Sequence, residues 1–218
     1  MGTRIFGKGG VAACVAFALA VLLVGSISFV NASTGERIEL AGSTYEIPKR
    51  YLRYPVGAKD KGLYIAASLA NLTPVSQADQ ASLPPGWGDV LLILVHDARS
   101  TTDTQFRWHV SQGIYGPLKQ VEPQFGLDTY LGGREGIAPR QHDPSVPLTL
   151  TYKTLYWHEA PPLFLTCDGD KAVPYPGCKQ TFSEDGLLYE IDFGKQNLPK
   201  WVDIQQRAVE LMRKFRVK

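Results

Sequence analysis

Residues 198–218, LPKWVDIQQRAVELMRKFRVK, carry the clearest structural pattern in the chain. Pro199 fits the first turn of a helix, because the N–H that proline lacks would have no intrahelical acceptor there. Basic residues at the end of the stretch complement the negative end of the helix dipole. Apolar side chains recur at alternating spacings of three and four, which predicts a long amphipathic helix whose buried face carries Trp201, Ile204, Ala208, Leu211 and Phe215.

Upstream of this helix, short runs of alternating polar and apolar residues are typical of half-buried β-strands. Residues 37–40 and 44–47 predict a β-hairpin, whose second strand ends at Pro48 because proline cannot donate to a ladder. The uninterrupted apolar run at residues 90–95 predicts the middle strand of the sheet, covered on both faces. Further strands are predicted at residues 62–69, 106–110, 148–157, 163–167 and 187–193.

Many strands and one long terminal helix define an α+β fold, with a mainly antiparallel sheet and the C-terminal amphipathic helix packed on it. Residues 73–88 and 132–147 are punctuated by Pro and Gly and are predicted to be long surface loops. The chain has 218 residues, of which 44% are hydrophobic and 20% charged. This length and composition fit a single globular domain.

Residues 1–32 direct the chain into or across a membrane. Arg4 and Lys8 precede residues 11–30, which carry no charge. This arrangement fits either a single-pass transmembrane helix in the bacterial inner membrane or a signal peptide cleaved after Ala32. The length of the uncharged run favours the anchor, since about 20 residues suffice for a helix to cross a bilayer.

Both alternatives place the remaining chain, residues 33–218, outside the cytoplasm as one extracytoplasmic domain, either tethered to the inner membrane or soluble in the periplasm. Its charge is balanced, because two of the 23 basic residues precede it and the other 21 match 21 acidic residues. No cluster of Lys and Arg with interleaved aromatics is present, so nucleic acid is not an expected partner.

Catalytic and cofactor motifs are not found. The sequence lacks G-x-S-x-G and the glycine-rich nucleotide-binding patterns, and its four histidines never occur at metal-binding spacing. We therefore predict no cofactor and no metal site. His96 and Asp97 follow the apolar run at residues 90–95, where catalytic groups often lie, although a polar pair more commonly just ends a strand at the surface.

Cys167 and Cys178 bracket a stretch containing two prolines and two glycines. Outside the cytoplasm such a pair is most simply a disulfide. Trp87 and Tyr115 lie in loop sequences rich in Pro and Gly, and exposed loop aromatics often bind a protein partner. The alternative for both is an aromatic ring folded back over its own loop.

Three segments together resemble a known group of proteins: residues 45–52, the stretch from Cys167 to Cys178 with Pro176 before the second cysteine, and residues 198–204. They resemble uncharacterised exported or membrane-anchored proteins of proteobacteria, some of which are similar to periplasmic immunity proteins encoded beside secreted antibacterial toxins. The resemblance implies a binding role with a protein partner, and it assigns no catalytic residue.

The first hypothesis is therefore a non-enzymatic periplasmic binding protein whose partner is another protein, in its sharpest form an immunity protein that occludes a toxin. The second is an envelope hydrolase with a site near His96 and Asp97. The third is a structural subunit of an envelope complex, which would associate stoichiometrically with membrane machinery.

Overall fold

The computed structural model describes residues 35–56, 62–76, 78–79, 88–98, 102–111, 118–133, 151–169 and 173–217. These residues belong to one compact unit, Thr34–Lys218. The predicted membrane segment at residues 11–30 lies outside them. Within the described ranges, no helix combines the length and apolarity that a bilayer crossing requires.

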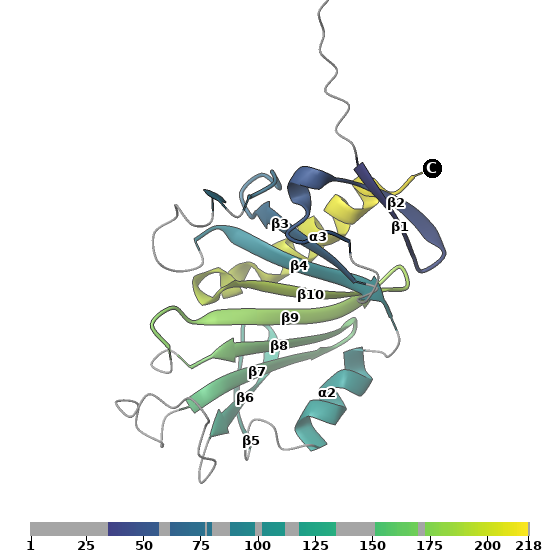
Figure 1. The fold of residues 1–218 in the computed structure, drawn as a ribbon. Coiled ribbons are helices and arrows are strands. Elements are labelled where there is room, and N and C mark those ends of the chain that lie inside the picture. Colours follow the sequence, from purple (N-terminus) through teal and green to yellow (C-terminus); the bar gives the residue numbers. More distant parts are fainter. Residues whose placement is uncertain are drawn as a thin grey trace, which may run out of the picture. The chain divides into compact units, whose positions relative to one another are not determined.

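An antiparallel sheet of eight strands organises the domain, in the order β3-β4-β10-β9-β8-β7-β6-β5 (Figure 1). The predicted mainly antiparallel sheet is confirmed. Its strands are β3 (Gly62–Ser68), β4 (Val90–Asp97), β5 (Leu118–Gln124), β6 (Leu127–Gly133), β7 (Thr151–Glu159), β8 (Pro162–Asp168), β9 (Gly177–Glu184) and β10 (Leu187–Gly194).

The chain reaches this order by one long crossing. After β3 and β4, helix α2 (Thr102–Ser111) carries it to the opposite edge of the sheet, where β5 begins. Six consecutive strands then return as a meander, and the last of them, β10, pairs with β4. Residues 90–95 thus form an inner strand, but β4 is second from one edge instead of central, and Leu92 and Leu94 on one of its faces are only half-buried instead of covered.

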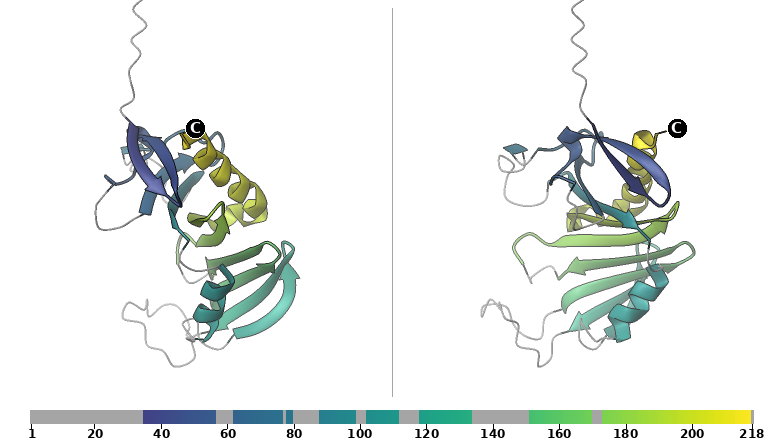
Figure 2. Two further views of the ribbon diagram at one scale, coloured as in Figure 1. Left: turned by 90° about the vertical axis from the view of Figure 1, so that its right-hand side faces the viewer. Right: turned by 45° about the vertical axis from the view of Figure 1, so that its right-hand side comes forward.

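Helix α3 (Trp201–Phe215) packs on one face of the sheet, as predicted (Figure 2). It buries Ile204, Ala208 and Leu211, while Trp201 and Phe215 are partly buried at its two ends. A 3-10 helix, η2 (Lys195–Lys200), precedes it and contains Pro199. The buried stripe meets inward side chains of β4, β9 and β10 and forms the main hydrophobic core.

The predicted hairpin is confirmed as β1 (Gly35–Leu40) and β2 (Ser43–Pro48), which is followed by the short 3-10 helix η1 (Lys49–Tyr51). Its two-residue turn has positive φ at both Ala41 and Gly42, as a type I′ turn requires. The hairpin closes the core near the end of α3, where Tyr45 forms a bridge with Arg216.

Residues 106–110 are helical, so the strand predicted there is wrong. They belong to α2, which lies on the sheet face opposite α3 (Figure 2). Phe106 stacks on Trp157 of β7 with ring centroids 4.4 Å apart, and its ring also meets Phe164 edge-on at 5.3 Å. One half-buried aromatic ring against the sheet, together with the Asp103–Arg107 ion pair one turn apart, fits a helix better than an alternating strand.

Candidate binding site

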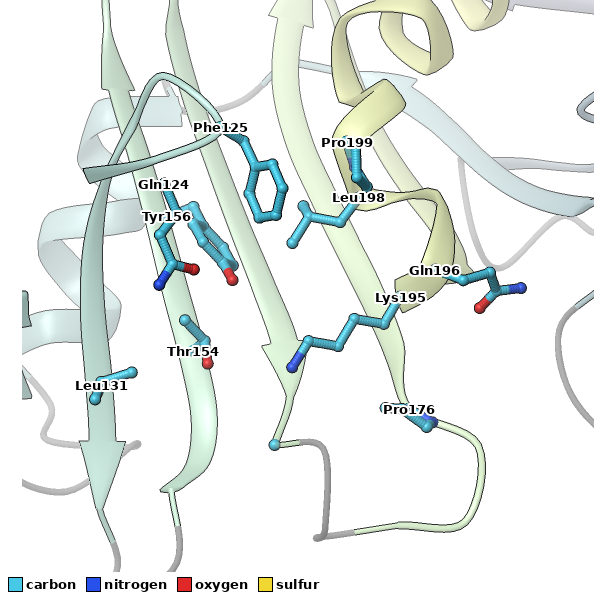
Figure 3. Close-up of a pocket in the computed structure, with 11 residues that line it drawn as sticks. Gln124, Phe125, Leu131, Thr154, Tyr156, Pro176, Lys195, Gln196, Leu198 and Pro199 are labelled. Atoms are coloured by element: carbon cyan, nitrogen blue, oxygen red, sulfur yellow. The ribbon is translucent and has the colours of Figure 1, made fainter. Parts of the chain in front are cut away.

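A pocket of about 600 Å³ lies beside α3, between the tip of the β5–β6 hairpin and η2 (Figure 3). This volume is in the range of ligand-binding pockets. Its walls come from segments far apart in the sequence, and its described lining residues are Gln124, Phe125, Leu131, Thr154, Tyr156, Gly169, Pro176, Lys195, Gln196, Leu198 and Pro199.

Phe125 forms the tip of the β5–β6 hairpin and one wall of the pocket. Phe125 and Gly126 have φ values of 54° and 76°, again the signature of a type I′ turn. Asn, Asp or Gly normally occupies the first of these positions, and a bulky residue with positive φ is uncommon. The Phe125 side chain is 46% exposed, so the turn holds an aromatic ring at the surface at a conformational cost.

The opposite wall is η2, and one hydrogen bond joins the hairpin tip to the first residue of α3, directly after η2. The Trp201 indole Nε1 donates to the backbone oxygen of Phe125 at 3.1 Å. Leu198 points toward the Phe125 ring across the pocket (Figure 3), and the Tyr156 ring lies 6.3 Å from the Phe125 ring, measured between centroids. The cleft between these walls combines aromatic and aliphatic side chains with the polar groups of Gln124, Thr154 and Lys195.

Gly169 and Pro176 line the pocket from the loop that is closed by the predicted disulfide, which is present between Cys167 and Cys178. The two cysteines pair directly across β8 and β9 and are buried. Asp168 then accepts a hydrogen bond from the backbone N–H of Gly177 at 3.0 Å. Lys195 Nζ donates to the Asp168 backbone oxygen at 2.8 Å and thereby ties η2 to this loop.

The lining chemistry suits binding better than proton transfer. Among the described lining residues, Lys195 is the charged one, and none is His, Asp, Glu or a free Cys. General acid–base catalysis needs a group that titrates near the working pH within reach of the substrate. An apolar cleft with polar groups at its margin instead accommodates an apolar side chain or ligand.

His96 and Asp97 do not form a pair, because adjacent strand residues point to opposite faces of a sheet. Asp97 Oδ1 accepts a hydrogen bond from the backbone N–H of Ala41 at 2.6 Å and so supports the β1–β2 turn. His96 Nε2 lies 3.4 Å from Glu190 Oε1 on the other face. The hydrolase hypothesis therefore loses the pairing on which it depends.

Trp87 and Tyr115 lie outside the described residues, so their predicted binding role stays a prediction. Across the portion of the chain that is described, no three His, Cys, Asp or Glu side chains are grouped as a metal site requires.

The sequence did not lead us to expect Phe125 as a site residue. The available signal was Phe125-Gly126 between two short alternating runs, but Phe-Gly is not among the usual hairpin dipeptides.

No family model matches the chain, and no curated protein matches its sequence. Among solved structures, the fold is similar to that of an immunity protein of the Stenotrophomonas maltophilia type IV secretion system, with a TM-score of 0.60 and 15% identity over 85% of this chain and 94% of that one. A second similar structure is the iron-regulated outer membrane lipoprotein FrpD of Neisseria meningitidis, with a TM-score of 0.46 and 15% identity over 83% of this chain and 92% of that one. The expected resemblance to immunity-like proteins is thus supported at the level of the fold.

Proposed function

We propose that this chain is an immunity-type protein of the bacterial envelope, whose exported domain binds a secreted protein toxin and neutralises it by covering it. The fold shared with an immunity protein over 85% of this chain is the observation that carries the proposal. The uncharged segment at residues 11–30 supports an envelope location, either as an inner-membrane anchor or as a cleaved signal.

The pocket beside α3 is the proposed docking site for the partner. Binding energy at protein interfaces concentrates where an apolar or aromatic side chain of one protein enters a pocket of the other. The exposed Phe125 ring and the facing Leu198 provide such a pocket, and the disulfide and the Trp201 hydrogen bond hold its walls in place before binding. A preformed pocket lowers the ordering cost of association.

A contact competition assay tests the immunity role even while the toxin is unidentified. The gene is deleted, and the deletion strain is grown in contact with its secretion-proficient parent. We expect the parent to outcompete the deletion strain, and a plasmid copy of the gene to restore survival. Equal survival of the deletion strain and the parent would argue against an immunity role.

Two variants of the plasmid copy then test the pocket. Phe125→Asn removes the ring while keeping a residue that tolerates positive φ, and we expect it to fail to restore survival. Trp108→Ala is the matched control, because Trp108 is a comparably exposed aromatic, at 53%, on α2 across the sheet. Protection by Phe125→Asn equal to that of the wild type would exclude the pocket from partner binding.

The intact mass of the protein recovered from detergent-solubilised envelopes separates the two envelope locations. A mass that includes Met1 corresponds to an anchored protein, and a mass that begins after Ala32 corresponds to a cleaved signal. A protein recovered in the cytoplasmic fraction would contradict the proposed location.

A further inference from the structure

The sheet face opposite α3 carries a second, separate surface over β3, β4, β10 and β9. Helix α2 packs beside it, where Phe106 contacts Phe164 of β8 and Thr102 Oγ1 lies 3.2 Å from Ser183 Oγ. Alternate residues of the four strands point to this face, and the strand register aligns them in adjacent rows. Ala66, Thr181 and Leu188 are buried on this face, whereas Tyr64 is exposed and the six residues next to it are half-buried. We call this partly accessible surface the open face, formed by Tyr64, Leu92, Leu94, His96, Lys179, Glu190 and Asp192.

Two carboxylates share one ammonium group on the open face. Lys179 Nζ lies 3.2 Å from Glu190 Oε2 and 3.3 Å from Asp192 Oδ2. The second oxygen of Glu190 is 3.4 Å from His96 Nε2. With the imidazole neutral, these four side chains carry one net negative charge. Burial raises the pKa of Asp192, and the ammonium groups of Lys179 and Lys153 offset this effect only in part.

An apolar and aromatic strip adjoins these charges. Tyr64 is 38% exposed and pairs in register with Leu94, which in turn pairs with Glu190. The Tyr64 ring meets the Tyr54 ring edge-on at 5.6 Å, and the Arg53 guanidinium lies 5.8 Å from the centre of the Tyr54 ring. Tyr64 and Glu190 are two strand spacings apart, roughly 10 Å, so one extended segment can reach both the aromatic strip and the carboxylates.

We propose that the open face docks a protein segment that presents an arginine or lysine beside an apolar side chain. The cation joins Glu190 and Asp192 and supplies the positive charge that Lys179 alone does not, while the apolar side chain packs on Leu94 and Tyr64. Charge-assisted hydrogen bonds to two carboxylates favour such a cation, and arginine can bind them in a planar, bidentate geometry.

The same charges disfavour other partners. Phosphate groups of nucleic acids or anionic lipids would meet two carboxylates at close range, which is repulsive. This surface is distinct from the pocket beside α3, and the inference holds whether or not the partner is a toxin. The open face can therefore be tested independently of the immunity role.

Selection of phage-displayed random peptides on the full-length protein in detergent provides the test. We expect the selected peptides to be enriched in Arg or Lys next to an apolar residue. Synthetic copies of the selected peptides should bind the protein about 10-fold or more weakly when Arg is replaced by citrulline, which keeps the shape of the side chain and removes its charge. The double variant Glu190→Gln, Asp192→Asn should lose affinity for the Arg peptide to a similar extent.

Two controls separate binding from folding. Glu210→Gln removes a carboxylate from α3 on the other face of the sheet and should leave peptide affinity unchanged. Tyr64→Ala should weaken binding of the citrulline and the Arg peptides equally, because it removes the apolar contact and not the charge. Peptides without a preference for Arg or Lys, or an affinity unchanged in the double variant, would each overturn the proposal.

Discussion

The positive φ of Phe125 predicts how two substitutions in the pocket turn change the free energy of unfolding. The Phe125 side chain is 46% exposed, so removing it should cost about half of the free energy of burying a whole phenylalanine side chain, roughly 1–1.5 kcal/mol. The left-handed conformation costs an ordinary residue about 1–2 kcal/mol, whereas Asn adopts it more readily. Phe125→Asn should therefore change the free energy of unfolding by less than about 1 kcal/mol, because the two effects offset each other.

Phe125→Ala isolates the backbone effect at the same position. Alanine loses the ring contacts as Asn does, but it keeps the strain of positive φ. We expect the alanine variant to be less stable than the asparagine variant by about 1 kcal/mol, which corresponds to a Tm difference of about 2–4 °C in a domain of this size. If both variants reduced partner binding equally, the ring itself would be responsible for binding.

Urea unfolding of the full-length protein, followed by far-UV circular dichroism, measures this difference. The slope of the free energy against urea concentration should be the same for both variants, since the surface exposed on unfolding is nearly unchanged. An alanine variant as stable as the asparagine variant, or more stable, would refute the assignment of strain to this turn.

Three further perturbations have defined outcomes. Burial raises the pKa of Asp192, so its protonated form stabilises the folded state below the unfolded pKa of about 3.9, and this contribution is lost as the pH rises through the folded pKa. In urea titrations across pH, Asp192→Asn should therefore be at least as stable as the wild type at neutral pH, and the difference should close in acid. A large loss of stability at neutral pH would show that the ion pair with Lys179 dominates. Among the described residues, the Oε1 of the buried Gln180 finds no hydrogen-bond donor, and its Nε2 makes two long hydrogen bonds. Gln180→Met should therefore raise the free energy of unfolding by about 1 kcal/mol, whereas a loss of stability in urea would mean that those two bonds matter more. Replacing Cys167 and Cys178 together by Ala should lower the free energy of unfolding by about 3 kcal/mol, judged from an 11-residue separation, and calorimetry that showed no change in Tm would contradict this stabilising role.

Four elements differ from the expected fold: helix α2 replaces a predicted strand, and the strands β5, β6 and β9 were not predicted. In residues 106–110, aromatic and aliphatic side chains alternate with polar ones, but five residues are too few to distinguish the two periodicities when only Phe106 packs against the sheet. Strand β5 was missed because both of its faces are largely exposed, so LKQVEPQ shows no hydrophobic alternation. Its Pro123 is tolerated because β5 lies at the edge of the sheet.

The features predicted correctly depend on local order. The α3 stripe, the β1–β2 hairpin and the Cys167–Cys178 disulfide each involve residues close in the chain, where helical periodicity, turn chemistry and loop length act directly. These signals were sufficient for the α+β class and for the helix that packs on the sheet. They do not specify which strands become neighbours.

The sequence by itself therefore determined the elements with a strong local pattern and the α+β class to which they belong. Only the tertiary structure decided the pocket and the open face, since each depends on contacts between distant segments. Trp201 and Phe125, which join the pocket walls, are 76 residues apart, and His96 and Glu190 on the open face are 94 residues apart. Such pairs form because the meander from β5 to β10 returns the chain beside β4, and no local periodicity encodes that return.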